Sequence, residues 1–304
     1  MSDFKHRASS LKLCPTFGVH ITPALILLLF FSLIPIIISL MISFTDINIT
    51  GLADWSKIHF IGIENYENLF KDPTFLQSIG NSIFYVVIGV PLVIACSMGI
   101  ALLINFGNSW VFRLFRLIFY APSITNVVAV AVVWNYLYNP QFGLLNFILH
   151  FVHLGPVPWL QDPIIAKISL IILALWRAIG VDMLIFLAAL QGIPKAYYEA
   201  AQIDGANSWQ RLIKITIPML RFATFFVTVT TLIGWLQFFE EPFVMTSGGP
   251  LNSTNSIALF IYQNGFQFSK FGYAAAGSMV LFVIIILVTL IQFRGQHKQQ
   301  DNQM

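Results

Sequence analysis

Long apolar stretches separated by short polar segments run through the whole chain. A helix needs about 20 mostly apolar residues to cross the hydrocarbon of a bilayer, and six stretches approach that length. None of them alternates polar and apolar residues as a membrane β-strand does. The pattern predicts an all-α integral membrane protein with six transmembrane helices, over Ala24–Phe44, Ile79–Ile104, Leu117–Tyr138, Ile168–Leu190, Phe222–Phe239 and Ala274–Phe293.

The composition supports a membrane protein. Of the 304 residues 57% are apolar and only 10% are charged, whereas a soluble domain carries about 25% charged residues. The net charge of +3 is small and the basic residues are dispersed, which excludes the concentrated basic surface of a nucleic-acid-binding protein. We therefore expect the chain to contact membrane lipid and no nucleic acid.

The distribution of basic residues predicts the orientation. With the N-terminus in the cytoplasm, 11 of the 16 Lys and Arg residues fall in cytoplasmic segments and 4 fall outside, as the positive-inside rule requires. We expect a multi-pass protein of the cell membrane with both termini cytoplasmic. It comprises an N-terminal segment (1–20), a six-helix domain (21–294) and a polar tail (295–304) that we expect to be disordered.

The cytoplasmic loop between the fourth and fifth helices, residues 194–218, has the most informative pattern. Pro194 suits the first turn of a helix, and apolar residues follow it at helical spacing. Gly205 is placed to end that helix in a left-handed conformation, and Ser208 is placed to cap a second one. The loop is predicted to be a helix, a turn and a helix.

The order of residues within this loop is also specific. Glu199-Ala200-Ala201 is followed after three residues by Gly205, and after nine more by Ile215-Thr216-Ile217-Pro218. An amphipathic loop could simply lie at the interface and touch anionic lipid. This long spacing, however, resembles the EAA loop of binding-protein-dependent ABC importers. Three further segments, residues 190–194, 244–250 and 271–276, are similar to the maltose-type sugar permeases of that family.

The resemblance implies a permease subunit that moves a carbohydrate or a related polyol, delivered by an extracytoplasmic solute-binding protein. It also implies a second permease, in a heterodimer, and two ATPase subunits that hold ATP and Mg. In this family the helix of the EAA loop inserts into a groove of the ATPase and transmits its movement. We therefore expect ATPase-coupling roles, and no catalytic roles, for Glu199, Ala200, Ala201, Asp204 and Gly205.

The chain lacks the residues that an ATP-hydrolysing enzyme or an enzyme with a catalytic nucleophile would need. No G-x-x-x-x-G-K-[ST] sequence is present to bind nucleotide phosphates, and no Ser-His-Asp order indicates a nucleophile. His150 and His153 have a spacing that could hold a metal, but they lie at an interfacial helix end, and we interpret them as structural. We expect a transport subunit with no metal site and no cofactor of its own.

Ionisable residues at membrane depth are costly and usually face an interior or a partner. Arg177 and Asp182 lie about 140° apart around a helix, so they need not pair with each other. Sugar hydroxyls bind amides and carboxylates, and the apolar face of a sugar packs on aromatic rings, although Tyr and Trp can equally be interfacial anchors. Our candidates for the substrate path are Asn135, Tyr138, Arg177, Asp182, Trp235, Gln237, Phe239 and Glu240.

Two other functions are compatible with these residues. An ion-coupled secondary transporter could use Arg177, Asp182 and Glu240, and a membrane scaffold could use the amphipathic loop to recruit a soluble partner. The solute itself stays open among a disaccharide, an oligosaccharide, a polyol and a glycerol phosphate ester.

Overall fold

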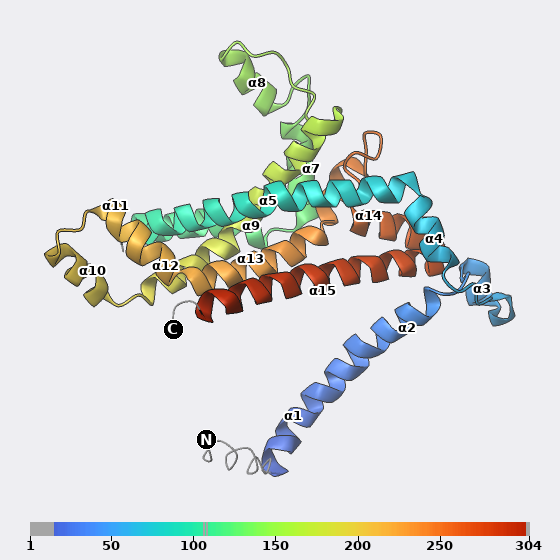
Figure 1. The fold of residues 1–304 in the computed structure, drawn as a ribbon. Helices are drawn as coiled ribbons and strands as arrows, with labels where there is room; N and C mark the ends of the chain where they lie inside the picture. The colour runs from blue at the N-terminus through green and yellow to red at the C-terminus, as the bar shows by residue number, and fades with distance from the viewer. Residues whose placement is uncertain (1–14, 106, 108, 302–304) are drawn as a thin grey trace.

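The fold is an elongated helical bundle, which a computed structural model describes over residues 15–105, 107 and 109–301 (Figure 1). Helix α9 (Pro163–Gln191) packs along α5 (Pro73–Asn105), while α6 (Trp110–Ile124) packs on α9 and α13 (Arg221–Leu236) packs mainly on α5. Buried apolar side chains of these helices form the core. The described residues contain no β-strand, only one isolated bridge between Thr45 and Phe60.

Within the described residues, four helices are long and apolar enough to cross a membrane, and the number rises to six if each of two bent helix pairs is one span. The six predicted stretches all fall on these elements. The four long spans cover Thr22–Ile42, Pro73–Asn105, Pro163–Gln191 and Phe271–Gly295.

The third predicted helix is wrong as a single continuous span. It is divided into α6 and α7 (Val127–Leu137), which meet at 102°. The side chain of Asn126 accepts a hydrogen bond from the backbone N–H of Val128 and so caps α7, which fixes a new helix start at the bend.

The fifth predicted helix, α13, begins at Arg221, one residue before the predicted Phe222, and differs from the prediction at its C-terminal end. A segment over Ser208–Met219 meets α13 at 60°, and α13 ends at Leu236. Phe239 therefore lies beyond the helix that we predicted to contain it, in the segment that follows α13.

The first span leaves the bundle obliquely (Figure 1). It consists of α1 (Pro15–Leu28), a π-helical turn η1 (Leu29–Leu33) and α2 (Ile34–Ile42). Most of its apolar side chains from Leu25 onward are exposed. Exposed apolar side chains are expected for a helix whose solvent is hydrocarbon.

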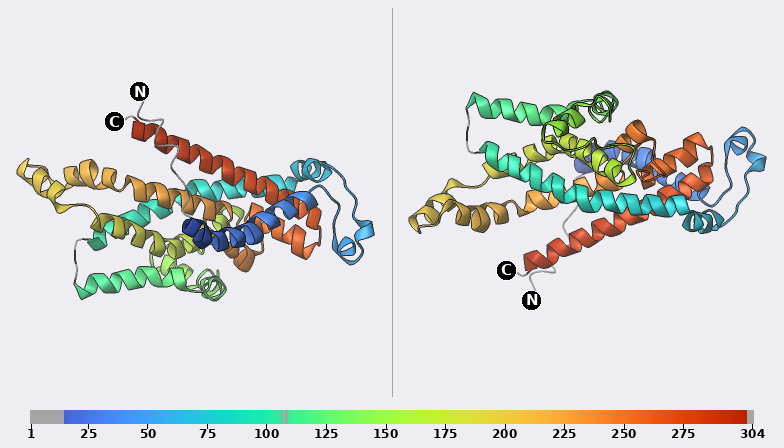
Figure 2. Two further views of the ribbon diagram at one scale, coloured as in Figure 1. Left: turned by 90° about the horizontal axis from the view of Figure 1, so that it is seen from below. Right: turned by 90° about the horizontal axis from the view of Figure 1, so that it is seen from above.

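The two ends of the bundle carry different elements (Figures 1 and 2). Helices α3 (Ile49–Ala53), α4 (Glu64–Lys71) and α14 (Ile257–Tyr262) lie at one end. Helices α10 (Lys195–Ile203) and α11 (Ser208–Arg211) project from the other. The start of α1 and the end of α15 point toward the end that holds α10.

The last helix, α15, runs from Phe271 to Asp301. The tail that we predicted to be disordered is therefore helical up to Asp301, and residues 302–304 lie outside the described part, as does most of the N-terminal segment 1–20. The shorter elements are η2 (Trp55–Lys57), α8 (Leu144–Phe151), η3 (Leu212–Thr216), α12 (Ile217–Met219), η4 (Pro242–Thr246) and η5 (Gln263–Gln267).

Helix α5 holds the loop before α14 through polar contacts. The buried side-chain amide of Asn81 donates to the carbonyl oxygens of Asn252 and Asn255 at 2.9 and 2.8 Å. One turn further, the Tyr85 hydroxyl donates to the carbonyl of Thr254 at 3.1 Å. These bonds join segments about 170 residues apart in the sequence, so they fix where the chain after α13 lies.

Replacing Asn81 by Ala should loosen this loop. The variant removes a buried donor from the carbonyl oxygens of Asn252 and Asn255, of which the first keeps a bond from the Asn255 N–H, and the loss costs about 1–3 kcal/mol. We expect a lower midpoint of thermal unfolding and faster amide hydrogen exchange over residues 247–256. Gln77→Ala is the matched control, because the exposed side chain of Gln77 donates to Leu251 in the same loop. Equal effects of the two variants would contradict the role of burial.

Candidate functional site

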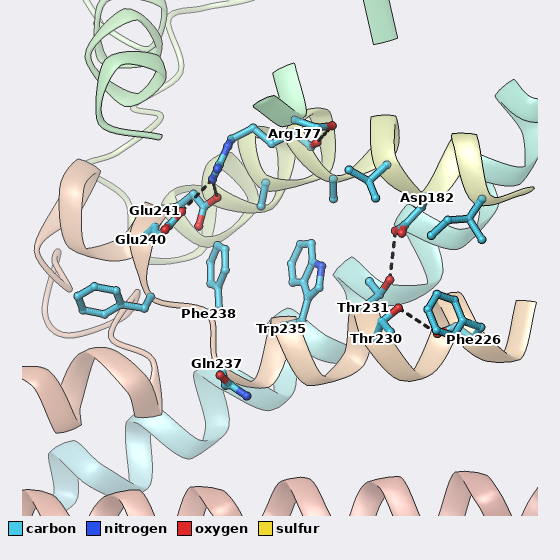
Figure 3. Close-up of a pocket in the computed structure, with 17 residues that line it drawn as sticks. Arg177, Asp182, Phe226, Thr230, Thr231, Trp235, Gln237, Phe238, Glu240 and Glu241 are labelled. Atoms are coloured by element: carbon cyan, nitrogen blue, oxygen red, sulfur yellow. Dashed lines mark hydrogen bonds and ion pairs between the residues drawn. The ribbon is translucent and has the colours of Figure 1, made fainter. Parts of the chain in front are cut away.

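A cavity of about 760 Å³ lies between α9, α13 and the segment that follows α13 (Figure 3). Its volume falls within the range of small-molecule sites. Ser123 of α6 closes one edge, where its hydroxyl donates to the carbonyl of Arg177 at 2.6 Å. Six of our eight candidates for the substrate path line the cavity: Arg177, Asp182, Trp235, Gln237, Phe239 and Glu240.

Arg177 stands at the middle of α9 and pairs with two consecutive glutamates. Its Nη1 lies 2.6 Å from Oε1 of Glu241 and 3.3 Å from Oε2 of Glu240. The Glu241 side chain is 8% exposed, whereas that of Glu240 is 56% exposed. Glu241 was not among the predicted candidates, although its position next to Glu240 was the available signal. The buried pair joins the middle of α9 to the segment after α13.

Asp182 does not pair with Arg177, in agreement with the predicted angle between them. It is buried and accepts a hydrogen bond from the Thr231 hydroxyl at 3.1 Å. Thr231 belongs to α13, so this bond links the two helices that flank the cavity. The sequence analysis did not identify Thr231.

An aromatic wall separates the two polar groups (Figure 3). The rings of Trp235 and Phe238 stack at 5.3 Å with an interplanar angle of 10°. The indole lies so close to α5 that a Cβ atom at Gly89 would be 2.0 Å from it, so this position requires glycine. Phe238, which the sequence analysis missed, also packs against Tyr85. The wall gives the cavity a rigid apolar side.

Two other candidates line the cavity less directly. Gln237 is exposed, and its amide points away from Arg177 in Figure 3. The ring of Phe239 stacks on Phe243 at 5.1 Å and contacts Tyr262, so most of its surface is used in packing with the segments that follow α13.

Asn135 and Tyr138 do not line this cavity. After the bend before α7, the end of the third span meets α9 at Ser169, nearer the start of α9 than Arg177 and Asp182. Tyr138 is fully buried, and its hydroxyl donates to the carbonyl of Ser169 at 2.8 Å. Its ring packs between Trp134 and Trp159, so Tyr138 has a packing role here.

The loop over residues 194–218 is folded as a helix, a turn and a helix. Gly205 ends the first helix with φ of +77°, a conformation that favours glycine. The cap of the second helix is Asn207 and not Ser208 as we predicted. Its side chain accepts from the Gln210 backbone, and the Gln210 side chain accepts from the Asn207 backbone, which is a capping box.

Helix α10 protrudes from its end of the bundle and is exposed. None of its residues is buried, and of the five predicted coupling residues only Ala201 is half-buried, the other four being exposed. One side-chain contact ties α10 to the chain that leads into α13, because the Tyr198 hydroxyl lies 3.0 Å from that of Thr216. A protruding helix with small side chains can approach a partner surface closely.

The binding-protein-dependent transport system inner membrane component family matches residues 74–294. The chain belongs to this family. It is therefore a multi-pass membrane permease subunit of an ABC importer. This family assignment favours the importer over the ion-coupled carrier and the scaffold that the sequence left open.

The sequence matches to similar proteins cover most of the length of the permease. The lactose transport system permease protein LacF of Rhizobium radiobacter is 36% identical over 286 residues, which cover 93% of this chain and 94% of the relative. The arabinooligosaccharides transport system permease protein AraP of Halalkalibacterium halodurans is 35% identical, with coverage of 81% and 79%.

A solved structure has the same fold. A chain in the crystal structure of a bacterial alginate ABC transporter, in complex with an alginate pentasaccharide-bound periplasmic protein, superimposes with a TM-score of 0.79 at 25% identity. The match covers 91% of this permease and 92% of that chain.

Removing Arg177 should destabilise the permease far more than removing Glu240. Arg177→Gln leaves the buried Glu241 carboxylate without its cation, a loss of about 3–5 kcal/mol. Glu240→Gln removes an exposed partner worth about 1 kcal/mol or less. The midpoint of thermal unfolding of the purified protein measures both.

The double variant Arg177→Gln/Glu241→Gln provides the control. It removes both buried charges, so its unfolding midpoint should lie well above that of Arg177→Gln alone. A double variant that unfolds at the same temperature as the single variant would show that the pairing does not account for the loss.

Proposed function

We propose that this permease carries a carbohydrate or a related polyol, delivered by an extracytoplasmic solute-binding protein. The observation that supports this most is the cavity beside the middle of α9, where carboxylates and an aromatic wall lie side by side. Carboxylates accept hydrogen bonds from hydroxyls, and aromatic rings pack on apolar faces. Two of the relatives are named as permeases for lactose and for arabinooligosaccharides, which supports the same substrate class.

The partners follow from the family. A second, related permease would complete the pathway as a heterodimer, and two ATPase subunits would bind ATP and Mg. The end of the bundle that carries α10 and the end of α15 would be cytoplasmic, together with the N-terminus. The opposite end, with α3, α4 and α14, would receive the solute from the binding protein.

A chain of contacts connects α10, the proposed coupling helix, to the cavity. The Tyr198–Thr216 contact joins α10 to η3, and η3 leads through α12 into α13. Helix α13 carries Thr231 and Trp235 of the cavity lining. A displacement of α10 by a closing ATPase would therefore move one side of the cavity relative to α9, shifting the population of outward-facing and inward-facing states.

ATP dependence tests this function. Proteoliposomes that contain the permease, its partner permease, the ATPases and the binding protein should take up the sugar only when ATP is present on the ATPase side. Omitting the ATPase should abolish uptake. Uptake that persists without ATPase and collapses with a protonophore would instead support an ion-coupled carrier.

Replacing Gly205 by Val tests the coupling loop. Val at a positive φ costs about 1–3 kcal/mol, and an altered backbone there misplaces α10 against its partner. We expect ATP-driven uptake to fall roughly tenfold, since about 1.4 kcal/mol corresponds to one decade, while membrane insertion is unchanged.

Gly62→Val is the matched control. Gly62 also has a positive φ and open space around it, as Gly205 does, but it lies at the opposite end of the bundle. It reproduces the strain at the end that would face the binding protein, so binding of the ATPase subunits to the permease should be normal in Gly62→Val and reduced in Gly205→Val. Equal loss in both variants would contradict a specific coupling role for Gly205.

A further inference from the structure

The cavity lining is unbalanced in charge. Among the described residues that line it, one side chain is cationic, Arg177, and three are carboxylic acids, Asp182, Glu240 and Glu241. With both glutamates ionised, the lining carries a formal charge of −1 when Asp182 is protonated and −2 when it is ionised. Neither protonation state of Asp182 makes the cavity positive.

The single cation is also already engaged. Its Nη1 donates to Glu241 at 2.6 Å and to Glu240 at 3.3 Å. An anionic solute that displaced Glu241 from Nη1 would leave that buried carboxylate unpaired, and one that approached the rest of the guanidinium would meet the negative charge of both glutamates. Arg177 is therefore expected to bind an anionic solute weakly, despite its positive charge.

The same groups suit an uncharged solute. Glu240 is 56% exposed, so its carboxylate is accessible to hydroxyl donors. The stacked pair of Trp235 and Phe238 offers an apolar surface beside it. A neutral sugar can use both without bringing a second negative charge next to the carboxylate of Glu240, which would repel it.

We propose that this cavity selects against anionic solutes and passes uncharged carbohydrates or polyols. The inference rests on the proposed function and narrows it, because it excludes uronates, sulfonates and phosphate esters. Family membership alone does not decide this point, since one relative is named for lactose and another for sulfoquinovosyl glycerol, which carries a sulfonate.

The charge of the cavity can be measured without knowing the solute. Val181 lines the cavity between Arg177 and Asp182 of α9 and is 46% exposed. In a variant in which Cys14 and Cys96 are replaced by Ser, Val181→Cys provides one reactive thiol. The assembled transporter would be treated with a cationic and an anionic methanethiosulfonate of similar size.

We expect the cationic reagent to react at least tenfold faster, relative to the rates of the two reagents with a free thiol. Adding Glu240→Gln should reduce this preference several-fold, because it removes one negative charge from the lining. Glu67→Gln is the matched control, since the Glu67 side chain is 55% exposed and ion-paired with Lys71 outside the cavity. It should leave the preference unchanged.

A faster reaction of the anionic reagent, or a preference that Glu240→Gln does not alter, would overturn the inference. A second measurement separates this failure from failure of the proposed function. Uptake of a uronate oligosaccharide as fast as that of its uncharged counterpart would overturn only the charge selection. If the cavity proves negative but the transporter takes up neither the charged nor the uncharged sugar, the carbohydrate function is contradicted. The narrower substrate class then fails with it.

Discussion

The desolvation of charge inside the membrane is the constraint on which the arrangement of the cavity depends. Arg177 lies in the middle of the long helix α9, where an isolated guanidinium would be costly. Its pair with the buried Glu241 removes that cost only if the chain after α13 returns to α9 at this level. The Asp182–Thr231 hydrogen bond makes a second connection between α9 and α13. The two polar links fix the flanks of a cavity that apolar packing alone would close.

Hydrophobic pattern predicts the number of spans well because the hydrocarbon thickness sets their length. The pattern does not predict where a span bends, and the third span shows why. Apolar residues continue on both sides of Thr125 and Asn126, so an average over a window gives one helix, while the cap at Asn126 produces a bend of 102°. Asn135 and Tyr138, which were candidates because amides and aromatic rings suit a sugar, lie beyond this bend and do not line the cavity.

The candidate residues fall into two groups: some can be recognised from the sequence, and others only from the packing of the helices. Charges at membrane depth are rare enough to be recognised from the sequence, and Arg177, Asp182 and Glu240 all reach the cavity. Thr231 could not be recognised, because a Thr hydroxyl in a helix usually bonds to its own backbone, as Thr228 and Thr230 of the same helix do. What identifies Thr231 is its position opposite Asp182, which only the packing of α13 on α9 reveals.

The unequal burial of the two glutamates bears on how such a cavity could change shape. A single buried ion pair resists separation, because each charge would be left bare. Arg177 instead faces one buried and one exposed carboxylate, so the guanidinium can keep a partner while the segment after α13 shifts along α9. An arrangement that holds the cavity walls together, yet allows them to slide, is what alternating exposure of a solute to the two sides of a membrane requires.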